Sequence, residues 1–176
     1  MLLINFDKFG KLKGKPYIDI PIQTGKDYIQ DPAFSTVNNA VIMFMSVPVY
    51  NMQNKPIGCV VAVIKGNVLN EVVKSIEVTK GYHPNIINRI NNEIIAKGDE
   101  VTDERIDTVE MDPNNNLLNI SRRICEGETG IDTYDDPITG KRKIASFRPV
   151  EGCDWAVFCP APYEAFYGDL TAMWHL

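Results

Sequence analysis

The chain has 176 residues, which is enough for one large domain or two small ones. Its composition, 44% hydrophobic and 23% charged, is typical of a folded soluble domain. The net charge of −5 and the scattered basic residues exclude a general electrostatic basis for nucleic-acid binding. No apolar run of about 18 residues predicts a membrane-spanning helix. The opening "MLLINF" lacks the features of a signal peptide.

The first third of the chain predicts a strand-rich module. Residues 2–13 predict two short strands around a turn, and residues 16–26 predict a short helical or irregular segment. Residues 27–35 predict a strand that Pro32 ends. Residues 40–50, "AVIMFMSVPVY", are apolar at nearly every position, which predicts a central strand covered on both faces.

Another strand and a helix follow. A polar turn, "NMQNK", separates the central strand from the β-branched run "PIGCVVAVI" at residues 56–64, so the two predict a hairpin. Residues 67–81 carry apolar residues at helical spacing, and Gly81 lies where a C-terminal cap is expected. We interpret this helix as a connector between two modules.

The pattern then begins again. Residues 84–98, "PNIINRINNEIIAKG", align with "LLINFDKFGKLKG" at residues 2–14, with a turn at Asn91 and Asn92. A second helix is expected over 112–127, followed by a hairpin around "DPITGK" and a last strand, "DWAVFCPAP". The corner "SVPVYNMQNKPIGCVV" is echoed by "SFRPVEGCDWAVF". The chain therefore predicts two similar α+β modules joined by a helix.

Catalytic and metal-binding motifs are absent from the sequence. It contains no G-x-S-x-G, H-E-x-x-H, P-loop or dinucleotide glycine pattern, so we expect no enzyme activity. The four cysteines have no metal-ligand spacing and are expected to be small buried residues, although a Cys125–Cys153 disulfide remains an alternative. The acidic run from Asp99 to Asp112 lacks EF-hand spacing and is expected to be a solvated helix face or loop. We expect no metal and no cofactor.

Taken together, the stretches "GKDYIQDPAFS", "MSVPVYNMQNKPIGCVVAVI", "IINRINNEIIAKGDE" and "SFRPVEGCDWAVFCPAPYE" resemble the double Cache sensor domain. That family forms the extracytoplasmic ligand-binding region of bacterial chemoreceptors and sensor kinases. The resemblance implies two PAS-like modules, each an antiparallel five-stranded sheet with flanking helices. It also implies a long N-terminal helix that this chain lacks, so the chain resembles a truncated sensor whose apolar surface another segment must cover.

The resemblance sets the expected module boundaries. A membrane-distal module is expected over residues 1–66, and a connecting helix over 67–81. A membrane-proximal module is expected over 82–165, and an exit toward the membrane over 166–176.

The resemblance also implies a ligand site in the distal module, with its candidate residues at Lys15, Tyr17, Asp31, Phe34, Ser35, Phe44, Ser46 and Val63. Lys15 stands where amino-acid-binding members carry an arginine, and Val63 stands where they carry an aspartate that holds the ligand's amine. These departures disfavour an α-amino acid. A cation beside a phenol instead suits a small carboxylate or another small anion.

Several residues have a structural alternative. Lys15 is otherwise a solvated lysine beside a packing tyrosine, and Asp31 and Ser35 otherwise make turn hydrogen bonds around Pro32. Met43, Phe44 and Met45 are expected in the core or on a pocket floor. Ser46 and Ser146 occupy similar positions in the two modules, which favours a shared structural role.

The predicted function is that of an extracytoplasmic small-molecule sensor of a membrane-anchored bacterial receptor, first of all a methyl-accepting chemotaxis protein. Segments outside this chain would anchor it to the membrane, and the full-length receptor is a candidate homodimer. Two alternatives stay open. One is the sensor of a histidine kinase or cyclase, and the other is a structural or protein-interaction module that binds no small ligand.

Overall fold

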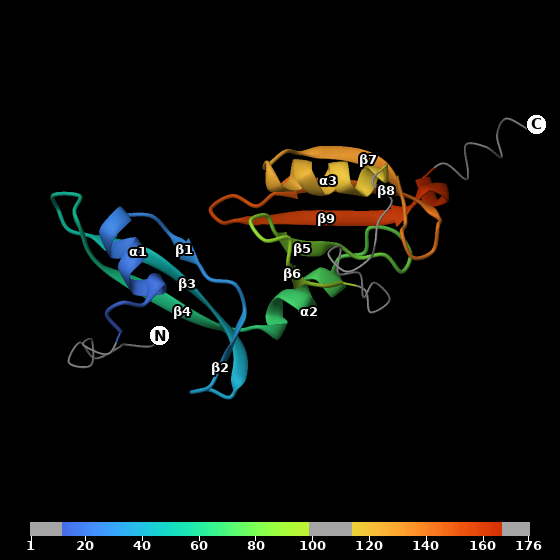
Figure 1. Cartoon of the computed structure of the whole chain (residues 1–176). Coiled ribbons are helices and arrows are strands. Elements are labelled where there is room, and N and C mark those ends of the chain that lie inside the picture. The colour runs from blue at the N-terminus through green and yellow to red at the C-terminus, as the bar shows by residue number, and fades with distance from the viewer. Residues whose placement is uncertain (1–11, 99–113, 167–176) are drawn as a thin grey trace, which may run out of the picture. The chain divides into compact units, whose positions relative to one another are not determined.

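A computed structural model describes residues 12–98 and 114–166 of the chain (Figure 1). The chain divides into two compact units, Met1–Asn67 (unit 1) and Val68–Leu176 (unit 2). The hairpin expected over residues 2–13 lies almost wholly outside the described residues, and so do the acidic run and His175. Within the described ranges, no helix combines the length and the apolar character needed to cross a membrane.

Unit 1 contains one helix and a small antiparallel sheet. Its elements are α1 (Pro16–Thr24), β1 (Tyr28–Ile29), β2 (Ala33–Ser35), β3 (Ala40–Tyr50) and β4 (Pro56–Lys65). β3 is the central strand, as its sequence predicted, because β1, β2 and β4 all pair with it. Pro32 interrupts the predicted strand over 27–35, and pairing resumes in β2. The sheet has four described strands, and β3 and β4 form the predicted hairpin.

Helix α1 forms where the sequence left helix and irregular structure open. Pro16 occupies the first helical turn, where a missing N–H costs nothing. Gly25 ends the helix at φ 66°, and its N–H donates to the carbonyl of Pro21. Ile18 and Pro21 are buried. The helix therefore packs its apolar side on β3 and β4.

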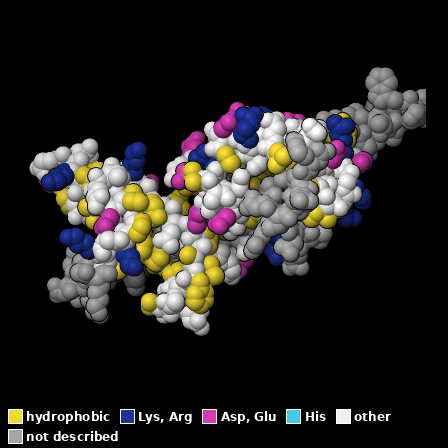
Figure 2. Space-filling view, in the orientation of Figure 1, with side chains coloured by type: hydrophobic (Ala, Val, Ile, Leu, Met, Phe, Trp, Pro, Cys, Tyr) yellow, Lys and Arg dark blue, Asp and Glu magenta, His cyan; other side chains and the backbone are white. Residues whose placement is uncertain are grey.

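The two faces of the unit 1 sheet differ in exposure. Ile42 and Ser46, on one face, are 7% and 2% exposed. On the opposite face Val47 is 46% exposed and its cross-strand partner Val60 is 60% exposed. Figure 2 shows hydrophobic side chains at the surface over β2, β3 and β4. Met43, on this second face, is nevertheless 1% exposed, so part of the face is covered, as the expectation of a core position for Met43 predicted. The prediction that β3 is covered on both faces therefore holds at Met43 and fails at Val47 among the described residues, because a continuous apolar run does not show which elements are present to cover it.

Unit 2 carries the antiparallel five-stranded sheet that the family resemblance implied. Its strands are β5 (Asn85–Asn88), β6 (Ile94–Ala96), β7 (Gly130–Asp135), β8 (Arg142–Pro149) and β9 (Trp155–Pro162). Its helices are α2 (Asn67–Ser75) and α3 (Asn116–Cys125). Helix α2 begins at Asn67, the last residue of unit 1. The strand order is β6-β5-β9-β8-β7, antiparallel throughout. The first hairpin thus pairs with the last strand.

The core of unit 2 lies between α3 and the sheet. Leu117, Ile120 and Ile124 share one side of α3 and are at most 3% exposed. They pack with buried side chains of the strands, namely Ile87, Tyr134, Ala145, Phe147, Ala156 and Phe158. Gly127 follows the helix at φ 76°, as the sequence predicted for the residue that ends it.

Helix α2 is shorter than the sequence predicted. It ends at Ser75, and the backbone then forms a tight turn in which Thr79 bridges Tyr82. Gly81, expected as a helix cap, lies in this turn at φ 76°. The prediction failed because a left-handed glycine suits a tight turn as well as a helix C-terminus.

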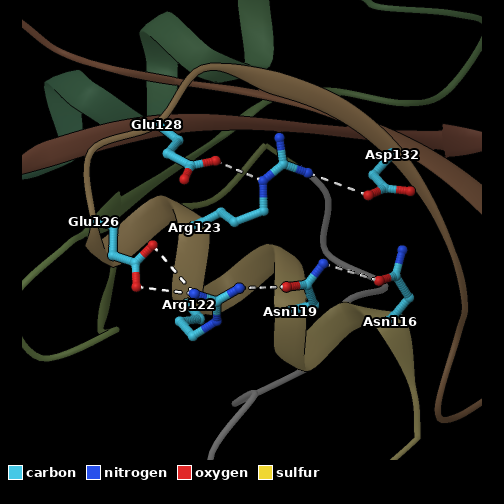
Figure 3. Close-up of polar contacts among 7 residues, drawn as sticks. All are labelled: Asn116, Asn119, Arg122, Arg123, Glu126, Glu128 and Asp132. Atoms are coloured by element: carbon cyan, nitrogen blue, oxygen red, sulfur yellow. Dashed lines mark hydrogen bonds and ion pairs between the residues drawn. The ribbon is translucent and has the colours of Figure 1, made fainter.

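Arg123 of α3 joins the helix to the edge strand. Its guanidinium contacts Glu128 at 2.7 Å and Asp132 at 3.2 Å (Figure 3). The guanidinium also lies over the ring of Phe147, 4.9 Å from its centroid. Gly130 permits this approach, because a Cβ atom there would lie 2.5 Å from the guanidinium.

Candidate ligand-binding site

The candidate site lies in unit 1, between α1 and the sheet face that it covers. Tyr17 of α1 stacks on Phe44 of β3, with ring centroids 4.0 Å apart and planes within 8°. Burial raises the pKa of the Tyr17 phenol. The structure therefore brings two of the predicted site residues into direct contact.

Ser46 lies on the same face, two residues further along β3. Its side chain is 2% exposed, and its hydroxyl has no hydrogen-bond partner among the described residues. Its neighbours in the sheet are Tyr28 of β1 and Val61 of β4. A buried hydroxyl without a partner costs roughly 1–3 kcal/mol, so such groups are uncommon and call for an explanation.

Two residues of β4, Val63 and Cys59, also lie on this face. Val63 pairs directly with Phe44 and is 57% exposed, so it lies toward the open side of the site. Cys59, on the same strand, donates to the backbone carbonyl of Tyr17 at 3.9 Å, and burial raises the pKa of its thiol. Tyr17 therefore contacts β3 through its ring and β4 through its backbone carbonyl.

The remaining predicted residues lie at the margins. Lys15 is the exposed N-cap residue of α1. Asp31 is half-buried between β1 and β2, where its charge adds to burial in raising the pKa of Tyr28. Ser35 accepts hydrogen bonds from the backbone and side chain of Asn38, which is the turn role that the sequence left open.

Phe34 is not part of this group. It pairs with Val41, so its side chain lies on the face of the sheet opposite Phe44. It is 62% exposed there. Because strand residues alternate between faces, the register separates Phe34 from Tyr17 and Ser46 although all lie close in the sequence.

Sequence reasoning missed Tyr28 and Cys59. Tyr28 enters the site because β1 pairs with β3 at Ser46, and Cys59 enters because β4 passes beneath α1. The alternation of apolar residues in β4 could have indicated that Cys59 shares a face with Val61 and Val63. No local signal indicates the register of a two-residue strand such as β1.

The arrangement combines the stacked rings of Tyr17 and Phe44 with the buried hydroxyl of Ser46 and the neighbouring Tyr28. These groups suit the binding of a small molecule. Among the described residues no group of three His, Cys, Asp or Glu side chains could hold a metal ion. All four cysteines are half-buried thiols, so the alternative Cys125–Cys153 disulfide is not formed.

Comparisons with known proteins place the fold. Residues 4–170 match a family model described as "Cache domain", of the double Cache type. The extracellular domain of mmHK1S-Z3, assigned as a histidine kinase, shares 20% identity at a TM-score of 0.66, covering 90% of this chain and 57% of that one. The ligand-binding domain of Mlp24 with asparagine shares 14% identity at a TM-score of 0.54, covering 97% and 64%.

A third similar structure is the sensory domain of the Campylobacter jejuni chemoreceptor Tlp3 with isoleucine bound, at 15% identity and a TM-score of 0.58. The alignment covers 88% of this chain and 56% of that structure. The chain thus spans less than two thirds of the length of these structures. A comparison with curated proteins found no match. The match over residues 4–170 shows that the chain belongs to the double Cache family of sensor domains.

Proposed function

We propose that this chain is part of the extracytoplasmic sensing region of a membrane-anchored bacterial receptor, and that unit 1 binds a small carboxylate or another small anion. The observation that carries the proposal is the buried hydroxyl of Ser46, unpartnered beside the stacked Tyr17 and Phe44. A ligand oxygen accepting from this hydroxyl would recover the hydrogen bond that folding leaves unmade.

Binding would act by selecting a conformation. Tyr17 covers Phe44 in this structure, so a ligand that enters between them must displace the phenol ring or slide beside it. A ligand shifts an equilibrium only by its difference in affinity for the two states. A ligand that displaces the Tyr17 ring would therefore stabilise the state in which this ring no longer covers Phe44. α2 begins at Asn67, where the two units divide, and would carry the change toward unit 2.

 The sensory domain of a chemoreceptor and the extracellular domain of a protein assigned as a histidine kinase share this fold. A chemotaxis receptor is our first proposal for the whole protein, and the sensor of a histidine kinase or cyclase is the second. In either receptor the anchoring segments would lie outside this chain, and the assembled receptor is a candidate homodimer.

A non-sensing module is the alternative that a specific observation favours. Tyr17 already fills the space above Phe44, so the described residues are also consistent with a packed unit that takes no ligand. The two proposals differ in one measurable respect, because only a sensing unit gains stability from a small molecule.

Thermal unfolding of the full-length sensing region, measured against small carboxylates, amines and sugars, tests the proposal. A ligand at a hundred times its dissociation constant should stabilise the protein by about 2.7 kcal/mol. Phe44→Ala should reduce that shift. Phe34→Ala is the matched control, since it removes an aromatic ring from the opposite face of the same sheet. If no compound shifts the transition, or if the two variants respond alike, the proposed site is wrong.

A further inference from the structure

The stack of Tyr17 on Phe44 shows which shape fits the unit 1 site. The two rings are nearly parallel, with 8° between their planes and 4.0 Å between their centroids. Both side chains are half-buried, so the pair lies at the edge of the packed face. The space above Phe44 therefore has the thickness of one aromatic ring, and in this structure the protein's own phenol fills it.

The Tyr17 ring can leave this place while α1 stays on the sheet. The buried residues Ile18 and Pro21 hold the helix, and the Cys59 thiol donates to the backbone carbonyl of Tyr17. None of these contacts uses the Tyr17 side chain. Rotation about the side-chain bonds of this half-buried residue moves its ring toward solvent. The exchange of the phenol for another ring thus gives up the contact with Phe44 and leaves the fold of unit 1 in place.

Ser46 places a hydrogen-bond donor beside the ring position. It lies on the same face as Phe44 and two residues further along β3, which is roughly 6.6 Å at the rise of a strand. The residue is 2% exposed, and its hydroxyl has no partner among the residues that the structure describes. A ligand that combines a ring on Phe44 with an acceptor attached directly to that ring would meet both groups.

The charges around this position favour an acidic acceptor. Tyr17 lies in the first turn of α1, where helix N–H groups carry positive partial charge, and the exposed Lys15 is the N-cap residue. Asp31 opposes an anion, since its charge raises the pKa of Tyr28, the sheet neighbour of Ser46. The same effect keeps the Tyr28 phenol protonated, so it is a second donor on this face that a carboxylate can use.

We propose that unit 1 binds an aromatic carboxylate, whose ring takes the place of the Tyr17 phenol on Phe44 and whose carboxylate accepts from Ser46. This inference rests on the proposed function, because it names one chemical class among the small carboxylates proposed there. A saturated ring is thicker and has no π-face to stack, and acetate has no ring at all. Tyr17 is then an internal competitor that closes the site when no ligand is bound.

Titration calorimetry of the full-length sensing region with benzoate tests the inference. The comparison probes are cyclohexanecarboxylate, which carries the same carboxylate on a non-planar ring, benzamide, which has the same ring without the charge, and acetate. Benzoate should bind most tightly, by about threefold to tenfold over cyclohexanecarboxylate, the gain expected of an aromatic pair beyond its buried area. Equal binding of benzoate and cyclohexanecarboxylate, or of benzoate and benzamide, overturns the inference.

Substitutions separate the roles of the two rings. Tyr17→Ala should strengthen benzoate binding about threefold to tenfold because the competing ring is gone, whereas Tyr17→Phe keeps that ring and should bind as the wild type does. Phe44→Ala should weaken binding by a similar factor, and Ser46→Ala by about tenfold or more. Phe34→Ala, on the opposite face of the sheet, is the matched control and should change nothing.

Weaker benzoate binding by a folded Tyr17→Ala variant would overturn the role of this ring as a competitor. If that variant does not fold, the four probes and the pair of Phe44→Ala and Phe34→Ala still decide the question. Absence of benzoate binding up to about 10 mM overturns the inference. In that case stabilisation by acetate or another non-aromatic anion would leave the proposed function standing, and absence of stabilisation by every compound would remove both.

Discussion

Tyr17 and Phe44 lie face to face, with ring centroids 4.0 Å apart, although one belongs to a helix and the other to the central strand. Their contact closes α1 over the sheet beside the unpartnered hydroxyl of Ser46. The same face therefore combines a well-packed pair with an unsatisfied polar group, and the proposed ligand site depends on this combination.

Ser46→Ala should stabilise the unliganded protein. It removes a buried hydroxyl that has no partner among the described residues, so the free energy of unfolding should rise by about 1 kcal/mol. The same change should weaken any ligand that stabilises unit 1. Urea denaturation measures the first effect. Ser146→Ala is the control, because Ser146 hydrogen-bonds Cys159, and it should lower stability. A loss of stability in Ser46→Ala would contradict the assignment.

The buried pair of Asp136 and Lys143 should make unit 2 sensitive to acid. Burial alone would raise the pKa of Asp136, but hydrogen bonds from Lys143 and from the N–H groups of Thr139 and Ile138 hold it below its ordinary value of 3.8. A carboxyl whose pKa is lowered by folding stabilises the protein above its unfolded pKa. That contribution should be lost as the pH falls below 3.8 and through the folded pKa.

Asp136→Asn tests this pair directly. Removing one partner of a buried ion pair leaves the other charge uncompensated, and the expected loss is about 3–5 kcal/mol at neutral pH. Chemical denaturation between about pH 7 and pH 2 should show a flatter acid limb for the variant than for the wild type. A parallel acid limb would assign the sensitivity to another group.

Asn115 has two separable roles. Its oxygen accepts from the N–H of Leu117 and caps α3, while its amide donates to the carbonyl of Asp135. Asn115→Ala should cost about 1–2 kcal/mol, because it removes both. Asn115→Asp keeps the cap acceptor and loses the amide donor, so thermal unfolding should place it between Asn115→Ala and wild type. Equal losses in both variants would show that the cap contributes nothing.

Gly130 should resist substitution. A Cβ atom there would lie 2.5 Å from Arg123 and 2.7 Å from Phe147, so Gly130→Ala should displace the guanidinium from the ring. The expected loss is about 1–3 kcal/mol, measured by thermal unfolding. Gly58→Ala is the control, since a Cβ atom at that strand glycine meets nothing within 4 Å. Equal stability of Gly130→Ala and the wild type would contradict the predicted clash.

Patterns that repeat over a few residues were predicted well. The apolar spacing of α3, the hairpin around "DPITGK" and the turn at Asn92, which has φ 58°, all follow from local rules. The end of α2 was missed because several local structures accept a glycine at positive φ. The exposure of one face of β3 was missed because burial depends on which other elements are present.

The sequence by itself determined the α+β class, the repeat of strand and helix patterns and the membership of the double Cache family, because these depend on periodicity and on the order of motifs along the chain. Only the tertiary structure decided which side chains share a face. The register of β2 places Phe34 away from Tyr17, and that of β1 brings Tyr28 beside Ser46. In a strand, one residue of register exchanges the two faces, so strand pairing decides the composition of the site.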